Sequence, residues 1–262
     1  MFSQGAHFVY AAARTVRSSA VAVAAFVTLG IVWSAAVRLF QVPPIMLPGP
    51  LVVLDAALKD ADVLLAATAS TVTDIVLAMA IAVAAGFATA VLIGISPLMR
   101  RMIFPYILMT QVVPKVALAP ILVAWFGIGM QSRLILAFLI AYFPMVINTL
   151  AGILATSEAN LRYARSLAAS TWQVLYKVQL PSALPSIMGG IKITAALAVI
   201  GIVVGEFVAT DGGLGKVIID ATAVLDTALT IAATLMIAGV GLALLVLVEF
   251  AEHRVVYWQV GR

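Results

Sequence analysis

The sequence predicts an all-α, polytopic membrane protein with about six transmembrane helices. Of its 262 residues, 64% are hydrophobic and only 10% are charged, and the mean hydropathy is +1.18. Soluble domains have about 25% charged residues and 45–50% apolar ones. The apolar residues also gather in segments of the length, about 20 residues, that a helix needs to cross a bilayer.

Six segments are long enough to span, and we expect them at residues 20–37, 71–95, 102–125, 134–154, 184–208 and 227–249. The third contains Pro105, Pro114 and Pro120, so it should be kinked or broken, because proline lacks a backbone N–H. Residues 42–50 hold four prolines and are expected to form an extended connector into a surface helix at 51–59. The chain, 1–262, should form one transmembrane domain.

The distribution of charge predicts the orientation. Seven basic residues lie in the N-terminal tail and in the loops after the second and fourth spans: Arg14, Arg17, Arg100, Arg101, Arg162, Arg165 and Lys177. Four lie in the opposite loops: Arg38, Lys59, Arg133 and Lys216. Because cytoplasmic loops carry an excess of Lys and Arg, both termini should be cytoplasmic.

Small residues recur at four-residue intervals along the second span: Ala78, Ala82, Gly86, Ala90 and Gly94. Residues four apart share a helix face, and small side chains let two helices approach closely. We favour helix packing within the chain, with a subunit interface as the alternative. Gly201 and Gly205 repeat the pattern in the fifth span.

Four ionisable residues lie inside the predicted spans: Asp74, Lys115, Lys192 and Glu206. Such residues are costly in a bilayer and often functional. Lys115 follows a proline in the kinked span, where a loosened backbone often lines a cavity. We therefore favour equally that Lys115 lines a translocation pathway and that it pairs with a group inside the protein. Asp74 and Lys192 lie near span ends, where Lys192 can reach the interface, and Glu206 can simply end its span.

Several chemistries are excluded. The chain has no cysteine, and its two histidines lie near its ends, so we expect no metal site and no catalytic triad. The segment 212–216, GGLGK, lacks the glycine and the hydroxyl residue that a phosphate-binding Walker A loop requires, because Thr210 and Val217 stand there. We therefore expect no catalytic residue, no nucleotide site and no nucleic-acid partner.

The longest polar break is the loop at about 155–183. It is expected to form a short surface helix with Ala164 and Ala168 on one face, Arg162 and Arg165 on another, and Pro181 at its end. Such a helix either lies at the lipid headgroups or fits a cleft on a cytoplasmic partner.

The loop resembles the EAA loop of ABC transporter permeases of the binding-protein-dependent family. That pattern is Glu-Ala-Ala, three residues, Gly, nine residues and Ile-x-Leu-Pro. The spacing places Arg162, Tyr163 and Ala164 at its start, Ala168 at the glycine and Val178 to Pro181 at its end. Ala164 and Leu-Pro match; Arg162, Tyr163 and Ala168 depart.

Other segments are similar to the nitrate/sulfonate/taurine branch of that family: MLPGP at 46–50, QVVPKVALAPILVAWFGIG at 111–129, FPMVINTLAG at 143–152 and GEFVATDGGLG at 205–215. The resemblance implies an importer permease fold. It implies ATPase-coupling roles for Arg162, Tyr163, Ala164, Arg165, Ala168, Ala169, Val178, Leu180 and Pro181. The candidates for a translocation pathway are Lys115, Asn148, Lys192 and Glu206.

The resemblance further implies a non-catalytic permease subunit in a bacterial cytoplasmic membrane. Its partners would be ATPase subunits that bind ATP and Mg²⁺, an extracytoplasmic substrate-binding protein, a second copy of the chain and membrane lipid. The substrate would be a nitrate-, sulfonate- or taurine-type anion or a related small organic molecule. The alternative is a secondary transporter driven by an ion gradient, with Asp74 and Glu206 as coupling residues.

Overall fold

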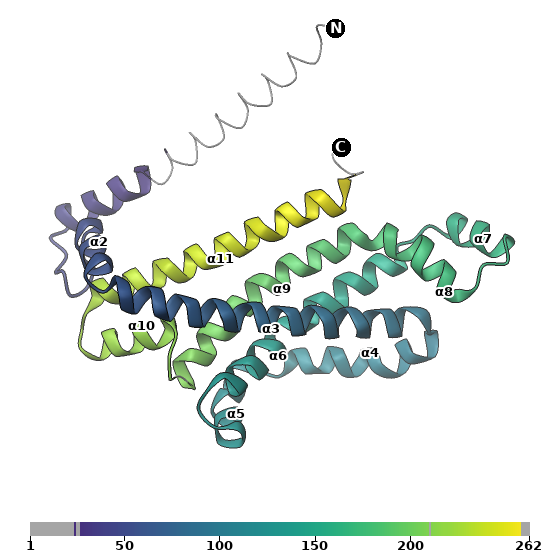
Figure 1. The fold of residues 1–262 in the computed structure, drawn as a ribbon, viewed down its shortest axis with the longest axis horizontal. Helices are drawn as coiled ribbons and strands as arrows, with labels where there is room; N and C mark the ends of the chain where they lie inside the picture. The colour runs from purple at the N-terminus through teal and green to yellow at the C-terminus, as the bar shows by residue number, and fades with distance from the viewer. Residues whose placement is uncertain (1–23, 25–26, 210, 258–262) are drawn as a thin grey trace, which may run out of the picture. The chain divides into compact units, whose positions relative to one another are not determined.

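The computed structural model describes residues 24, 27–209 and 211–257, and every regular element among them is a helix (Figure 1). The all-α prediction is confirmed. The contacts separate the chain into two compact units. The smaller contains the described residues up to Ala61 together with Ala221–Ala232, and the larger contains Asp62–Asp220 and the described residues from Ala233 on.

Four helices are long and apolar enough to cross a membrane: α3 (Ala61–Ile95), α6 (Met130–Leu154), the helix Thr171–Val208 and α11 (Thr227–Val255). A bent helix pair could form a fifth span. The first predicted span lies partly outside the described residues, and its described part belongs to the shorter helix Val27–Leu39. Helix α10 (Leu214–Ala223) connects the last two long helices.

The third predicted span is broken, as its prolines indicated. Helix α4 (Pro97–Val112) ends before Pro114, and a 3₁₀ turn (Lys115–Leu118) leads into α5 (Ala119–Phe126). The two halves are bent by 82°. Pro114 and Pro120 lie at the starts of the new helical segments, where a missing N–H costs little.

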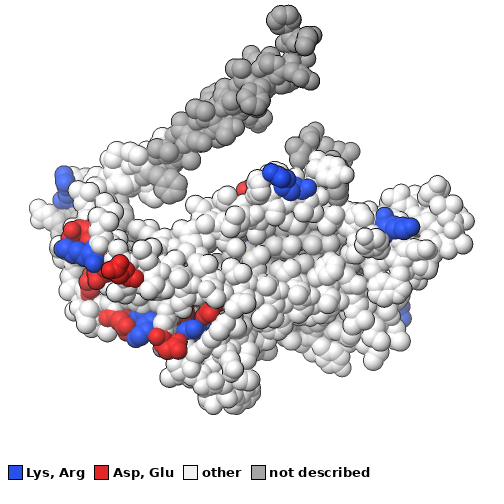
Figure 2. Space-filling model, in the orientation of Figure 1, with Lys and Arg blue, Asp and Glu red and all other residues white. Residues whose placement is uncertain are grey.

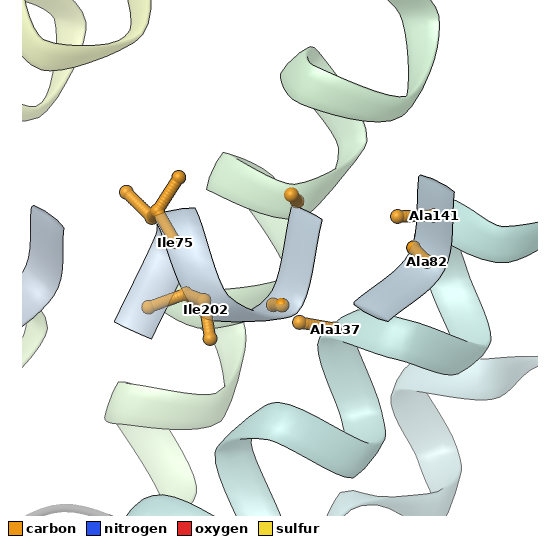
Figure 3. Close-up of a cluster of buried hydrophobic side chains, with 7 residues drawn as sticks. Ile75, Ala82, Ala137, Ala141 and Ile202 are labelled. Carbon is orange, nitrogen blue, oxygen red and sulfur yellow. The ribbon is translucent and has the colours of Figure 1, made fainter. Parts of the chain in front are cut away.

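The core of the larger unit lies where α3, α6 and α9 (Leu180–Val208) meet (Figure 3). Most of its side chains are small. Ala78 and Ala82 of α3 are fully buried against α6 and α9. A Cβ atom on Gly201 would lie 2.5 Å from Cα of Ala137, so these helices touch at their backbones. The small-residue pattern therefore serves packing within the chain.

Several span boundaries were predicted wrongly. Helix α3 begins at Ala61 and not at residue 71, and the fifth spanning helix begins at Thr171 and not at residue 184. Helix α6 begins at Met130, so Arg133 lies inside a helix and not in a loop. Helix α11 continues to Val255, past the predicted end at residue 249. The errors at α6 and α11 have one cause, because the prediction ended each span at a charged residue, whereas the helix continues and its charged residues, Arg133 and Glu252, form ion pairs.

In the smaller unit, the proline-rich segment is not helical, and it leads into α2 (Pro50–Lys59). Pro50 occupies the first turn of α2, where its fixed φ favours the helix. An exposed ion pair of 2.6 Å joins Lys59 to Asp55. The side-chain hydroxyl of Thr227 donates to the backbone oxygen of Ile45. The predicted helix is confirmed, but the connector is turned and not extended, because the N–H groups of Met46 and Leu47 both donate to the backbone oxygen of Pro43.

Candidate functional site

The polar loop at 155–183 contains two short helices, where the sequence predicted one. Helix α7 (Glu158–Ser166) carries an acidic residue in its first turn and Arg165 in its last, which suits the helix dipole. Helix α8 (Thr171–Val174) starts with a capping box, in which Ser170 and Gln173 exchange hydrogen bonds of 2.8 and 3.3 Å. The loop is thus an ordered element with its own capping groups.

The turn between these helices is a Schellman motif. The N–H of Ala168 donates to the oxygen of Arg165 at 3.0 Å, and the N–H of Ala169 donates to the oxygen of Ala164 at 3.2 Å. Ala168 has a φ of +54°, the left-handed conformation that this motif requires and that glycine normally supplies. This geometry explains why the EAA pattern has glycine at this position.

Replacing Ala168 with glycine should stabilise this turn. An alanine in the left-handed region costs about 1–2 kcal/mol. Glycine removes this cost but raises the entropy of the unfolded chain, which lowers the free energy of unfolding by about 0.4–1 kcal/mol. We therefore expect Ala168→Gly to reduce local opening of α7 by a few tenths to about 1 kcal/mol, measured as slower amide hydrogen exchange in α7. Exchange that is faster in Ala168→Gly would contradict the left-handed turn. Gly189→Ala, outside the loop, is the control.

The predictions that Ala168 shares a face with Ala164 and that Pro181 ends the loop helix are both wrong. Ala168 lies beyond the end of α7 and turns the chain. Pro181 lies in the first turn of α9, after the π-helix Leu175–Gln179. The N–H of Leu180 bonds to the oxygen of Leu175, and this wider register accommodates the proline. The helix therefore runs from Thr171 to Val208 without a break.

The surface of the loop is apolar and exposed. Four large side chains, from Tyr163, Leu167, Trp172 and Tyr176, are each about two-thirds to three-quarters exposed. A groove of about 420 Å³ runs between the two helices, and Tyr163, Ala164, Ala169 and Val178 contribute to its lining. Ala164 itself is buried, so it supports the loop from inside. The other predicted coupling residues on α7, Arg162 and Arg165, are exposed.

Lys115 lines a cavity of about 590 Å³ between α3, the broken span and α6. Its ammonium group donates to Oε1 of Gln111 at 2.8 Å. On the α3 and α6 side of the same cavity, the hydroxyl of Tyr142 donates to Oγ1 of Thr89 at 2.8 Å. The lining is mainly apolar but presents an ammonium, an amide and hydroxyl groups, and no described carboxylate pairs with Lys115.

Glu206 does not end its helix at a water-exposed surface. It is fully buried, and Thr71 donates to its Oε1 at 2.7 Å while the N–H of Gly215 donates to its Oε2 at 2.7 Å. Thr71 in turn accepts from the N–H of Leu214 at 2.8 Å. Gly213, with a φ of +92°, has no room for a Cβ beside Glu206. The glycine-rich GGLG segment therefore folds over a buried carboxylate.

The sequence reasoning missed Arg133, which is the partner of Asp74. Its Nη2 lies 2.9 Å from Oδ2 of Asp74, and both side chains are only 5% exposed. Its Nη1 lies 3.1 Å from Oδ1 of Asp211, which is exposed. A carboxylate in a span needs a nearby cation, and that rule could have pointed to Arg133, one residue before the predicted start of the fourth span.

The two remaining pathway candidates make contacts inside the larger unit. Lys192 of α9 forms an ion pair with Glu252 of α11. Asn148 of α6 donates from Nδ2 to the backbone oxygen of Pro144 at 2.8 Å, and its Cβ would lie 2.9 Å from a Cβ on Gly190. The structure therefore brings none of Asn148, Lys192 and Glu206 into the cavity that Lys115 lines.

Comparison with known proteins gives one consistent result. Residues 82–257 match the family described as binding-protein-dependent transport system inner membrane component. The chain is 33% identical over 226 residues to a probable ABC transporter permease protein of Haemophilus influenzae, across 86% of this chain and 92% of that one. It is 32% identical over 234 residues to the taurine transport system permease protein TauC of Escherichia coli, across 87% and 85%.

Among solved structures, an inward-facing form of the MetNI methionine ABC transporter has a chain with a similar fold. The TM-score is 0.63 at 20% identity, over 76% of this chain and 97% of that chain. Together with the family match, the helical architecture defines the molecule as an ABC transporter permease. The chain belongs to the binding-protein-dependent transport system inner membrane component family. This membership does not favour the secondary-transporter alternative.

Proposed function

We propose that the chain is the permease subunit of an ATP-driven importer and that the loop at 155–183 docks a separate ATPase. The observation that carries the proposal is the continuous helix from Thr171 to Val208. One end belongs to the loop, and the other packs against α6 at glycine contacts such as Gly201 on Ala137. Because the helix is continuous, a displacement of the loop would therefore also move the part of the helix that packs in the core.

The docking surface would be the exposed apolar part of the loop. Tyr163, Leu167, Trp172 and Tyr176 leave large apolar area in water, and burying such area against a partner is favourable at about 25 cal/mol per Å². ATP and Mg²⁺ would be bound by the partner ATPase, which would close and shift the loop. The permease would be a homodimer that alternates between outward- and inward-facing states and receives its substrate from an extracytoplasmic binding protein.

For the solute, we propose a nitrate-, sulfonate- or taurine-type anion or a related small organic molecule. The taurine permease among the relatives supports this class, as does the Lys115 cavity, in which the ammonium of Lys115 and the amide NH₂ of Gln111 supply hydrogen-bond donors. Pathway roles for Asn148, Lys192 and Glu206 stay predictions, and our assignment of the pathway rests on Lys115.

We further propose that the protein lies in a bacterial cytoplasmic membrane with α7, α8 and both termini on the cytoplasmic side. On the face seen in Figure 2, the end of the larger unit formed by α7 and α8 shows Lys and Arg and no Asp or Glu. An excess of basic residues is typical of cytoplasmic loops.

Reconstitution in liposomes tests the mode of energy supply. The purified chain alone should neither hydrolyse ATP nor accumulate taurine or a sulfonate under an imposed proton or sodium gradient. Asp74 and Glu206, which a gradient-driven mechanism would use, are both held in buried contacts. Uptake that is driven by a gradient, without ATP or a partner, would overturn the proposal and favour the secondary transporter.

A further inference from the structure

A further cavity lies where the loop meets the ends of the spanning helices, and of its lining residues only Arg165 and Ala169 are predicted ATPase contacts. Its volume is about 270 Å³, and it is lined by residues of the turn between α3 and α4, the end of α6, and α7 and α8. Two arginines, Arg100 of α4 and Arg165 of α7, line it together with Thr171 and Gln179. Residues 65 positions apart in the sequence thus place two guanidinium-bearing side chains around one cavity.

The charge in this cavity is uncompensated. No Asp or Glu lines it, and neither Arg100 nor Arg165 forms an ion pair within the part of the chain that the structure describes. Nε of Arg100 is buried and has no hydrogen-bond partner. Pro97, in the first turn of α4, also lines the cavity, and a helix N-terminus favours negative charge. A buried donor without an acceptor is costly, so the cavity is complementary to an anion.

The chemistry of the donors selects the kind of anion. A guanidinium group presents N–H groups in a planar fork that binds two oxygens of one oxyanion, and Arg is the preferred side chain for phosphate. The cavity also lies at the ends of two spanning helices, because Ile95 ends α3 and Leu154 ends α6. We expect phospholipid headgroups at this depth, because the spanning helices end here, and basic pockets between helices bind anionic lipid headgroups.

We propose that Arg100 and Arg165 form a site for a phosphate group, supplied either by an anionic phospholipid or by free phosphate. The occupant bridges the start of the broken span and the loop, since Arg100 belongs to α4 and Arg165 to α7. It therefore holds the loop against the span ends. Arg165 is also a predicted ATPase contact, whereas Arg100 has no assigned role, so the test rests on Arg100.

Native mass spectrometry of the full chain in a mild detergent measures whether an anionic phospholipid binds at this site. Phosphatidylglycerol should bind about tenfold more tightly than phosphatidylcholine, as expected for one charge-assisted hydrogen-bond pair. Arg100→Gln should abolish this preference, and Arg165→Gln should do the same by an independent change. Arg101→Gln is the matched control, since Arg101 is exposed, adjacent in sequence and absent from the cavity.

The melting temperature of the delipidated chain, with and without inorganic phosphate, measures whether free phosphate binds at the site. Phosphate that raises the melting temperature of the wild type and of Arg101→Gln, but not of Arg100→Gln, would identify free phosphate as the occupant if the chain also shows no preference for phosphatidylglycerol. The proposal is overturned if neither lipid nor phosphate binds, as expected for a cavity that accepts an acidic side chain of a protein partner. It is also overturned if Arg101→Gln loses as much binding as Arg100→Gln.

Discussion

Replacing Arg133 with methionine is expected to lower the free energy of unfolding of the detergent-purified chain by about 3–5 kcal/mol. The substitution leaves Asp74 buried with its closest cation removed, since Arg133 lies 2.9 Å from it and both side chains are 5% exposed. Methionine keeps much of the arginine's volume, so the loss reports the charge rather than a cavity. Denaturant titration followed by circular dichroism measures the change.

Two further variants test whether the loss of stability comes from the buried charge of Asp74. The double variant Arg133→Met with Asp74→Asn should recover part of the loss, because no buried charge is then left without a partner. Lys216→Met breaks the more exposed ion pair with Asp220 and should change stability by less than about 1 kcal/mol. If Arg133→Met were no more harmful than Lys216→Met, the buried pair would not be the structural element that we describe.

Gly201→Ala is expected to prevent α9 from packing on α6. The added Cβ would lie 2.5 Å from Cα of Ala137, and a backbone atom cannot move aside as a flexible side chain can. Overpacking of this kind costs about 1–3 kcal/mol or more. The variant should melt at a lower temperature and give less monodisperse protein on size-exclusion chromatography.

Gly189→Ala is the matched control for this prediction, because it lies on the same helix and a Cβ there meets nothing within 4 Å. Since alanine favours a helix over glycine by about 1 kcal/mol, Gly189→Ala should melt at the same temperature as the wild type or higher. Equal melting temperatures for the two variants would show that α6 and α9 do not touch at this point.

The sequence predicted the helices well because their determinants are local. The apolar runs located α3, α6, α9 and α11, and the prolines of the third span predicted its break, which falls at Pro114, whereas Pro105 lies inside α4. The four-residue spacing of small residues identified the face of α3 that is buried in the core. Each of these signals depends on neighbours within a few turns of one helix.

The parts that were predicted wrongly or missed depend either on a distant partner or on a local backbone conformation that the residue type does not indicate. Arg133 was placed in a loop because nothing local shows that Asp74, 59 positions away, lies beside it. The left-handed turn at Ala168 was missed because alanine normally avoids that conformation. Pro181 was expected to stop a helix, but the π-helix before it accommodates the proline, and the helix continues.

The docking of a separate ATPase on the loop is the central claim, and site-specific cross-linking tests it directly. The chain contains no cysteine, so Tyr163→Cys introduces a unique thiol at an exposed position of α7. In native membranes, a thiol-reactive cross-linker should join it to a protein that mass spectrometry identifies as an ABC ATPase. Val224→Cys, which is exposed and predicted to lie on the opposite side of the membrane, should give no such product. An ATPase adduct at Val224, or none at Tyr163, would contradict the claim.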